Sequence, residues 1–127
     1  MTKIMLGLLL TVAITPAMAN SLAVDAMLQS YRQLGVVSFD AQAGQQLWQE
    51  DFDGRSCGSC HGQDLTQTGK HVKTKKILKP MALSVNVDRF SKQKKMKKWF
   101  KRNCKWTLGR ECTPQEKGDI LTWLIEQ

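Results

Sequence analysis

Residues 57–61 read CGSCH, and this short run determines how the rest of the chain is interpreted. A Cys-x-x-Cys-His sequence is the attachment signature of a c-type haem. Its two thiols, three residues apart, reach the two vinyl groups on one edge of a porphyrin and become thioethers, and the histidine that follows is placed to bind the iron. The run therefore predicts one covalent haem c on Cys57 and Cys60, with His61 as the proximal iron ligand.

Two other uses of a cysteine pair fit this sequence less well. A structural zinc site needs a second pair of ligands, but Cys104 and Cys112 are not a close pair and no His-x-x-x-His follows. A thioredoxin-like redox pair needs a preceding strand and alternating strands and helices after it, and no such pattern is found. Once Cys57 and Cys60 hold the haem, only Cys104 and Cys112 remain, so they are expected to form a disulfide.

The first 19 residues, MTKIMLGLLLTVAITPAMA, have the features of a secretory signal peptide. A lysine is followed by an apolar run and by small residues in an Ala-x-Ala arrangement at Ala17 and Ala19. The apolar run is shorter than the roughly 20 residues of a membrane span. We therefore expect cleavage after Ala19, no stable membrane insertion after cleavage, and export of residues 20–127 to the periplasm as one domain.

The chain is strongly basic, with a formal net charge of +8 over 127 residues. Loss of residues 1–19 removes one basic residue, Lys3, and leaves a charge of +7. Because chromosomal DNA is not accessible outside the cytoplasm, nucleic acid is excluded as a partner. The basic surface is expected to face an acidic protein or anionic small molecules.

Capping signals predict helices on both sides of the CGSCH run. One is expected within residues 38–53, with Asp40 as N-cap and apolar residues at helical spacing. The other begins after Thr113, with Pro114 at the first helical position and Glu116 closing a capping box. The polar segment between the motif and Asp88 is expected to be a loop with at most a short helical turn. These signals favour an all-α fold.

A third helix is predicted between a Ser91 cap and Asn103, within the basic stretch KKMKKWFKRNCK of residues 94–105. Met96, Trp99, Phe100 and Asn103 fall on one face, and basic residues fill the rest. A buried amide at Asn103 needs a partner. Either Asn103 binds the iron opposite His61, or it caps the helix C-terminus in a left-handed conformation. Spacing alone does not decide between these interpretations.

Four other residues are candidates for the sixth iron ligand. Met81 follows a proline, as the iron-binding methionine of electron-carrying class I cytochromes does, but lies only twenty residues after His61. Met96 is more simply a core residue. The others are Asn86 and His71, and a histidine flanked by lysines is more often exposed to solvent.

Residues 57–124 resemble the high-spin cytochrome c family called SHP, for sphaeroides haem protein. The resemblance is carried by SCGSCHG, by SVN with RF, by KKWFKRNCKW and by GRECTPQEKGDILTWL. It implies a small class I cytochrome c-like fold around one haem. The helices expected near residues 38–53 and after Thr113 resemble the first and last helices of small class I cytochromes c, in which a glycine lets an aromatic residue of the last helix approach. Gly44 and Trp123 match those two residues, and the alternative is that Gly44 only weakens its helix. The resemblance to SHP also implies that Asn103 ligates ferric iron, that Cys104 pairs with Cys112, and that the redox partner is a dihaem cytochrome c. Val87 departs from the family, which has a proline there.

An amide oxygen is a hard, weak donor that suits ferric better than ferrous iron. Reduction is therefore expected to release Asn103 and to leave a position where oxygen, nitric oxide or carbon monoxide binds. Two alternatives remain. One is an ordinary His/Met electron carrier that uses Met81, and the other is a reductase of nitric oxide, hydroxylamine or peroxide, for which no distal acid or base is evident.

Overall fold

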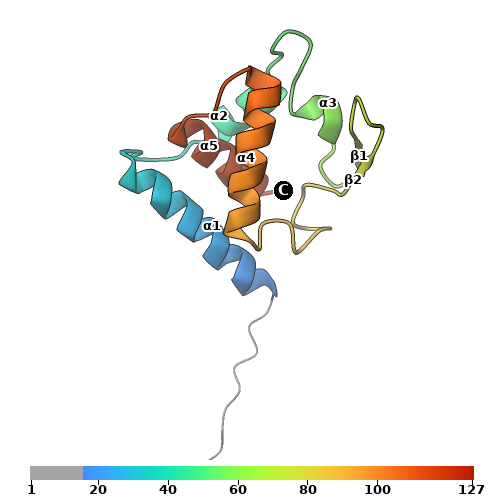
Figure 1. Cartoon of the computed structure of the whole chain (residues 1–127). Helices are drawn as coiled ribbons and strands as arrows, with labels where there is room; N and C mark the ends of the chain where they lie inside the picture. The colour runs from blue at the N-terminus through green and yellow to red at the C-terminus, as the bar shows by residue number, and fades with distance from the viewer. Residues whose placement is uncertain (1–15) are drawn as a thin grey trace, which may run out of the picture.

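The structure is a computed structural model that describes residues 16–127, with side chains described from residue 22 onward. Most of the predicted signal peptide, residues 1–15, lies outside the described residues, and residues 16–19 begin the first helix. The described part forms five helices and one short hairpin (Figure 1): α1 Pro16–Gln33, α2 Ala41–Gln49, α3 Gly58–His61, β1 Gly69–Lys70, β2 Ile77–Leu78, α4 Gln93–Leu108 and α5 Pro114–Leu124. The predicted all-α class is confirmed, with the hairpin as its small β element.

Both helix starts that were predicted from capping signals are confirmed. The side chain of Asp40 accepts hydrogen bonds from the backbone N–H groups of Gln42 and Ala43 at the start of α2. At the start of α5, the Thr113 hydroxyl accepts from the Glu116 backbone, and the Glu116 carboxylate accepts from the Thr113 backbone. Such caps pair backbone N–H groups that the first turn of a helix leaves free.

Helices α2 and α5 cross at close range, and Gly44 makes this possible. A Cβ atom at Gly44 would lie 2.1 Å from the backbone oxygen of Asp119 in α5. The Asp119 carboxylate in turn accepts a hydrogen bond of 2.8 Å from the backbone N–H of Asp40. Gly44 therefore admits the α5 backbone, whereas Trp123, its expected partner, packs on the Trp48 ring at 5.6 Å between centroids.

The third predicted helix exists, but both of its ends were predicted wrongly. α4 has Lys92 as its N-cap, without a side-chain hydrogen bond, while the Ser91 hydroxyl donates to the Asp88 carbonyl. It continues five residues past Asn103, to Leu108, and ends at Gly109 with φ 73°. Asn103 therefore lies within the helix, and its interpretation as a left-handed cap is wrong. Gly109 has the left-handed conformation instead, which a glycine adopts without steric cost.

Two elements were not predicted from the sequence. α1 contributes Val24, Met27 and Tyr31 to the core. The segment expected to be a loop contains the β1–β2 hairpin, in which Gly69 pairs with Leu78 and Lys70 with Ile77. Each strand has only two residues, which is too short for an alternating pattern to be recognised in the sequence.

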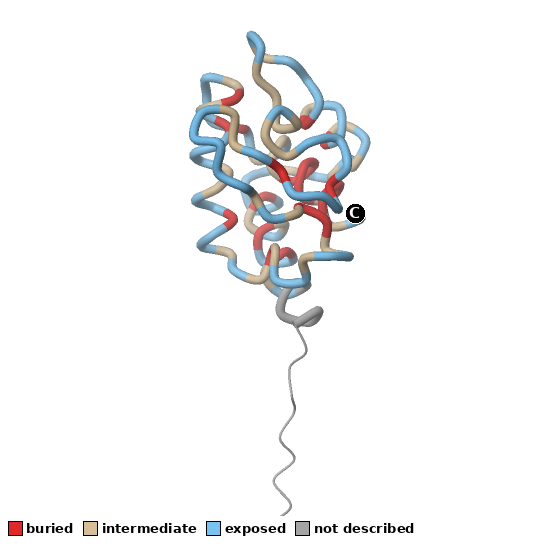
Figure 2. Tube along the Cα trace, turned by 90° about the vertical axis from the view of Figure 1, so that its right-hand side faces the viewer, coloured by how far each residue is buried: buried red, intermediate tan, exposed pale blue. Residues whose placement is uncertain are grey.

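Buried residues of α1, α2, α4 and α5 form one core cluster, and exposed residues cover the outside (Figure 2). In Figure 1, α4 stands between α1 on one side and α3 with the hairpin on the other. Among residues 16–127, no helix is long and apolar enough to cross a membrane.

Candidate haem site

The CGSCH run forms one helical turn, α3, that starts from Cys57 and ends at Gly62, whose N–H donates to the Gly58 carbonyl. Gly69 of β1 lies directly against this turn, because a Cβ there would be 2.2 Å from the Cys60 carbonyl oxygen. The β1–β2 hairpin therefore packs directly against the backbone of the CGSCH turn.

Both motif cysteines are free thiols and are half-buried. Burial raises the pKa of Cys57 to about 11, although a hydrogen bond with Thr107 of α4 lowers it in part. Cys57 is therefore a neutral thiol at pH 7 that lies next to α4. Thioether formation needs two free thiols at this spacing, so the pair fits the attachment of a haem.

His61 has the properties expected of an iron ligand. Burial, and secondarily the positive charge of Arg89, lower its pKa to about 4, so that the imidazole is neutral at pH 7. A neutral ring offers a nitrogen lone pair to a metal. Within the part of the chain that the structure describes, the Nδ1 atom of His61 is buried without a hydrogen-bond partner, and the centroid of the Trp48 ring lies 5.3 Å from that of the imidazole. The indole Nε1 of Trp48 is also buried without a partner. Together with the two thiols, this imidazole fits a covalently bound haem.

Asn103 is exposed, contrary to the expectation of a buried amide, and its surroundings explain the difference. It lies seven residues after Met96 and four before Thr107, and at about 100° per residue these three fall on one stripe of α4. Met96 and Thr107 are 1% and 2% exposed. The stripe is therefore buried at Met96 and at Thr107, but at Asn103, which lies between them, no other side chain of the described residues covers it.

Contacts of α4 connect this stripe to the motif. Thr107, one turn after Asn103, bonds to Cys57. Trp99, one turn before it, lies under the guanidinium of Arg89 at 4.7 Å from the ring centroid. Arg89 is in turn close enough to lower the pKa of His61. The Asn103 turn thus lies between two contacts that both lead to the CGSCH run.

The disulfide expected between Cys104 and Cys112 is present, with a Cα–Cα distance of 5.5 Å. Cys104 is 5% exposed. The residue next to Asn103 is therefore fixed to the segment that leads into α5.

The other candidate ligands are occupied by contacts within the chain. The Met81 sulfur accepts hydrogen bonds from the Arg89 guanidinium, one of them 3.1 Å long from Nε. The Asn86 amide donates to the Pro80 carbonyl at 2.8 Å. His71 is half-buried rather than exposed, and its Nδ1 accepts from two backbone N–H groups of its own turn. Met96 is a core residue, as expected.

Sequence reasoning gave Arg89 no role. It is half-buried, and within the described chain it contacts a thioether and an aromatic ring but no carboxylate. A single arginine in a chain with 19 basic residues gives little signal by itself.

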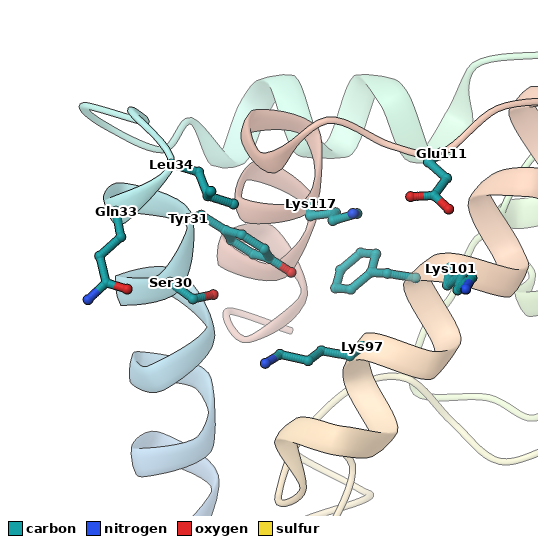
Figure 3. A pocket seen from close by; sticks show the side chains of 9 residues that line it. Ser30, Tyr31, Gln33, Leu34, Lys97, Lys101, Glu111 and Lys117 are labelled. Atoms are coloured by element: carbon teal, nitrogen blue, oxygen red, sulfur yellow. The ribbon is translucent and has the colours of Figure 1, made fainter.

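A cavity of about 520 Å³ lies elsewhere, between α1, α4 and α5 (Figure 3). Figure 3 shows Tyr31 pointing from α1 toward Lys97 and Lys101 of α4, with Lys117 of α5 above. None of the predicted haem-binding residues lines this cavity. It is therefore separate from the candidate haem site.

Comparison with known proteins identifies relatives of the whole domain. Residues 34–124 match a domain family of unknown function, DUF1924. The chain is 36% identical over 117 residues to the cytochrome c-type protein SHP of Cereibacter sphaeroides, covering 88% of this chain and 90% of SHP. It is 33% identical over 72 residues to cytochrome c'' of Methylophilus methylotrophus, covering 57% of this chain and half of that protein.

Solved structures agree with the sequence comparison. The structure of oxidised SHP, described as an oxygen-binding cytochrome c, superposes with a TM-score of 0.76 at 36% identity, over 82% of this chain and 96% of SHP. Oxidised cytochrome c'' superposes with a TM-score of 0.71 at 24% identity, over 81% of this chain and 93% of that chain, which supports the fold alone. The chain belongs to the SHP family of c-type cytochromes, and its cofactor is one covalently bound haem.

Proposed function

We propose that this chain is an exported cytochrome that binds diatomic gases after reduction and exchanges electrons with a redox partner. Cys57 and Cys60 hold the haem, His61 is the permanent iron ligand, and Asn103 is a reversible sixth ligand. The observation that carries the proposal is the exposed amide of Asn103 between two buried residues of one α4 stripe. The SHP relative is itself described as an oxygen-binding cytochrome c.

The haem, when bound, supplies an iron that changes oxidation state and accepts a small ligand at its sixth position. The chain decides when that position is open. The amide oxygen of Asn103 would hold ferric iron weakly and ferrous iron more weakly still, because it is a hard, neutral donor. With the haem bound, Asn103 would therefore hold the iron in the oxidised protein and would leave it in the reduced protein.

The surroundings of Asn103 suit a ligand that moves. Its backbone lies inside α4, next to the buried, disulfide-bonded Cys104. The disulfide and the helix hold the main chain in place, so that only the side chain has to move.

The contacts of Met81 argue against a His/Met electron carrier. Its sulfur accepts hydrogen bonds from Arg89, and the residue is 6% exposed within the core cluster. Binding to iron would require the thioether to give up these contacts, and would leave the Arg89 guanidinium without an acceptor. Asn103 needs no such rearrangement.

The partner is expected to be acidic, and a dihaem cytochrome c is proposed. The outer face of α4 carries a row of exposed basic residues: Lys94, Lys95, Lys97, Lys98, Lys101, Arg102 and Lys105. A row of one charge steers a partner of opposite charge toward the helix that also carries Asn103. Because the CGSCH run follows a predicted signal peptide, we place the protein in the periplasm.

Absorption spectra of two variants, Asn103→Ala and Met81→Leu, test the assignment. In the wild type, reduction followed by carbon monoxide is expected to give prompt binding of the gas. Asn103→Ala should change the ferric spectrum and leave carbon monoxide binding to the reduced protein intact. Met81→Leu, the matched control, should leave both spectra unchanged. A reduced wild type that ignores carbon monoxide until Met81 is replaced would overturn the proposal in favour of the electron carrier.

A further inference from the structure

Three lysines line the cavity between α1, α4 and α5. Lys97 and Lys101 lie one turn apart on α4, and Lys117 belongs to α5 (Figure 3). None of the three takes part in an ion pair among the described residues. Lys117 is half-buried, so water screens its charge less than that of a fully exposed lysine. The cavity therefore attracts anions.

Glu111 is the only residue with a carboxylate among the described residues that line this cavity, and it does not cancel the charge. Its Oε1 atom lies 3.6 Å from the Nζ atom of Lys105, which is not part of the lining. Three lysines and one glutamate leave the lining with a formal net charge of +2. The charge of Glu111 is also shared with a cation outside the cavity.

Tyr31 places a hydroxyl donor at the same cavity. The residue is 6% exposed, and Figure 3 shows its side chain pointing from α1 toward Lys97 and Lys101. Within residues 22–127, its hydroxyl has no hydrogen-bond partner, whereas the Ser30 hydroxyl beside it donates to the Met27 carbonyl at 2.6 Å. Burial raises the pKa of Tyr31 well above its ordinary value, so the hydroxyl is protonated at pH 7 and can donate.

The cavity also has an apolar side. Phe100, which is half-buried, and Leu34, which is largely exposed, complete this part of the lining. The volume of about 520 Å³ lies within the range of about 300–1,000 Å³ that is typical of small-molecule sites. An inorganic anion would meet the lysines but leave the apolar side chains uncovered. A ligand that matches the whole lining carries one anionic group and one apolar part.

We propose that this cavity binds a small organic carboxylate with an aromatic or branched aliphatic body. The carboxylate accepts charge-assisted hydrogen bonds from Lys97 and Lys101 and a further one from the Tyr31 hydroxyl. The apolar body packs against Phe100 and Leu34. None of the predicted haem-binding residues lines the cavity, so this function goes beyond gas binding and electron exchange.

A bound carboxylate would also affect the basic row of α4, to which Lys97 and Lys101 belong. It would neutralise part of the charge that the row presents to an acidic partner, and weaker steering would slow their association. This consequence rests on the proposed redox partner, whereas the binding itself does not.

The experiment is isothermal titration calorimetry of the haem-loaded protein at pH 7 and low ionic strength, with four probes. Benzoate has both a charge and an apolar body, benzamide lacks the charge, acetate lacks the body, and inorganic phosphate is an anion without an apolar part. We expect benzoate to bind more tightly than each of the other three. Added salt should weaken its binding, because the lysines of α4 are exposed.

Variants of the lining locate the binding site. Lys97→Gln/Lys101→Gln should lower the affinity for benzoate by about tenfold, because it removes two charged donors that are exposed to solvent. Tyr31→Phe keeps the buried ring and should lower the affinity by a smaller factor. Glu111→Gln should raise the affinity, because it removes the negative charge from the lining. This gain cannot result from a damaged fold.

Lys94→Gln/Lys98→Gln is the matched control, because it removes two lysines at the same spacing on α4 that do not line the cavity. Its affinity for benzoate should equal that of the wild type. The inference is overturned if millimolar benzoate gives no heat of binding, or if both double variants lose affinity equally. Phosphate that binds as tightly as benzoate would overturn the proposed ligand class. If benzoate does not bind but Lys97→Gln/Lys101→Gln alone slows electron exchange with the acidic partner, the cavity lysines belong to the docking face instead. The titration depends on neither gas nor iron oxidation state, so its failure leaves the proposed function standing.

Discussion

Gly69 shows how much one missing side chain contributes to the haem site. Its α-carbon faces the backbone of the CGSCH turn, and a Cβ there would lie 2.2 Å from the Cys60 oxygen and 2.9 Å from the His61 α-carbon. Real Cβ atoms do not approach backbone atoms so closely, and neither neighbour is a flexible side-chain end. Any larger residue has to push the motif away from the hairpin.

Gly69→Ala is therefore expected to displace the motif and to reduce the yield of covalently attached haem. We expect a loss of stability of about 1–3 kcal/mol, as for other overpacked sites. Gly58→Ala is the matched control, because a Cβ there would meet only side-chain atoms at 3.6 Å or more. The measurements are haem content after purification and urea unfolding of the loaded protein. Equal haem content and stability in the two variants would show that the hairpin does not support the motif.

Single residues differed in how far they could be predicted. Cys57, Cys60 and His61 were predicted from five consecutive letters, because haem attachment depends on spacing along the chain. Arg89 could not be recognised in this way. Its importance comes from Met81, Trp99 and His61, which lie in three different segments.

At the level of elements, the start of α5 is the best-defined local structure. The Glu116 carboxylate accepts from the Thr113 backbone N–H at 2.7 Å and forms a bidentate pair with Arg110 at 2.7 and 2.8 Å. The hydrogen bonds from Arg110 are the largest cause of a lowered pKa at Glu116, and the Thr113 backbone adds to the effect. The ionised form of Glu116 is therefore the one that stabilises the helix start.

Glu116→Gln is expected to cost about 1 kcal/mol at pH 7, since the carboxylate is partly exposed and solvent screens the pair. A carboxylate whose folded pKa lies below its ordinary value contributes stability above that value and loses it as the pH falls through the folded pKa. The difference in the free energy of unfolding between wild type and variant should therefore be largest at pH 7 and smaller at acidic pH. Urea unfolding at pH 7 and pH 3 measures it.

Glu111→Gln is the control for this prediction, because the side chain of Glu111 forms an exposed ion pair with Lys105 at 3.6 Å, and its hydrogen bond with Arg110 uses the backbone carbonyl, which the substitution keeps. Its loss should change stability by a few tenths of a kcal/mol at either pH. A penalty for Glu116→Gln that persists undiminished at pH 3 would contradict the role assigned to the charge.

Element boundaries were predicted well where a side chain forms a capping hydrogen bond with the nearby backbone. Asp40 and Thr113 do so, and both caps were identified correctly. The start of α4 has no such bond, and Lys92 rather than Ser91 occupies the cap. Its end was placed five residues too early because Asn103 is compatible with a cap, whereas Gly109 is the residue with the required positive φ.

On the scale of the whole molecule, charge is distributed unevenly and is expected to guide association. The basic row of α4 lies on the outside of the helix that carries Asn103, and the formal net charge is +8. Electron transfer to an acidic partner should then be fastest at low salt. It should slow as the screening length falls to about 8 Å at physiological ionic strength.

The double variant Lys94→Glu/Lys98→Glu should slow electron exchange with an acidic dihaem cytochrome c at low salt and flatten the salt dependence. Stopped-flow rates at increasing ionic strength provide the measurement. Lys73→Glu/Lys79→Glu makes the same change in charge at exposed positions in the β1–β2 region and is the matched control. An equal loss of rate in both double variants would show that net charge matters and the α4 row does not.

By itself, the sequence determined the features that depend on neighbours along the chain: the covalent haem, the CGSCH ligands as a prediction, the two capped helices and the disulfide pair. Each is specified within a few residues, or by elimination among four cysteines. The tertiary structure decided the rest. The exposure of Asn103 between buried neighbours, the contacts that occupy Met81, and the charge of Arg89, which no carboxylate of the described residues pairs, arise where segments distant in sequence meet. Burial and charge balance depend on contacts between these distant segments, so no local sequence pattern encodes them.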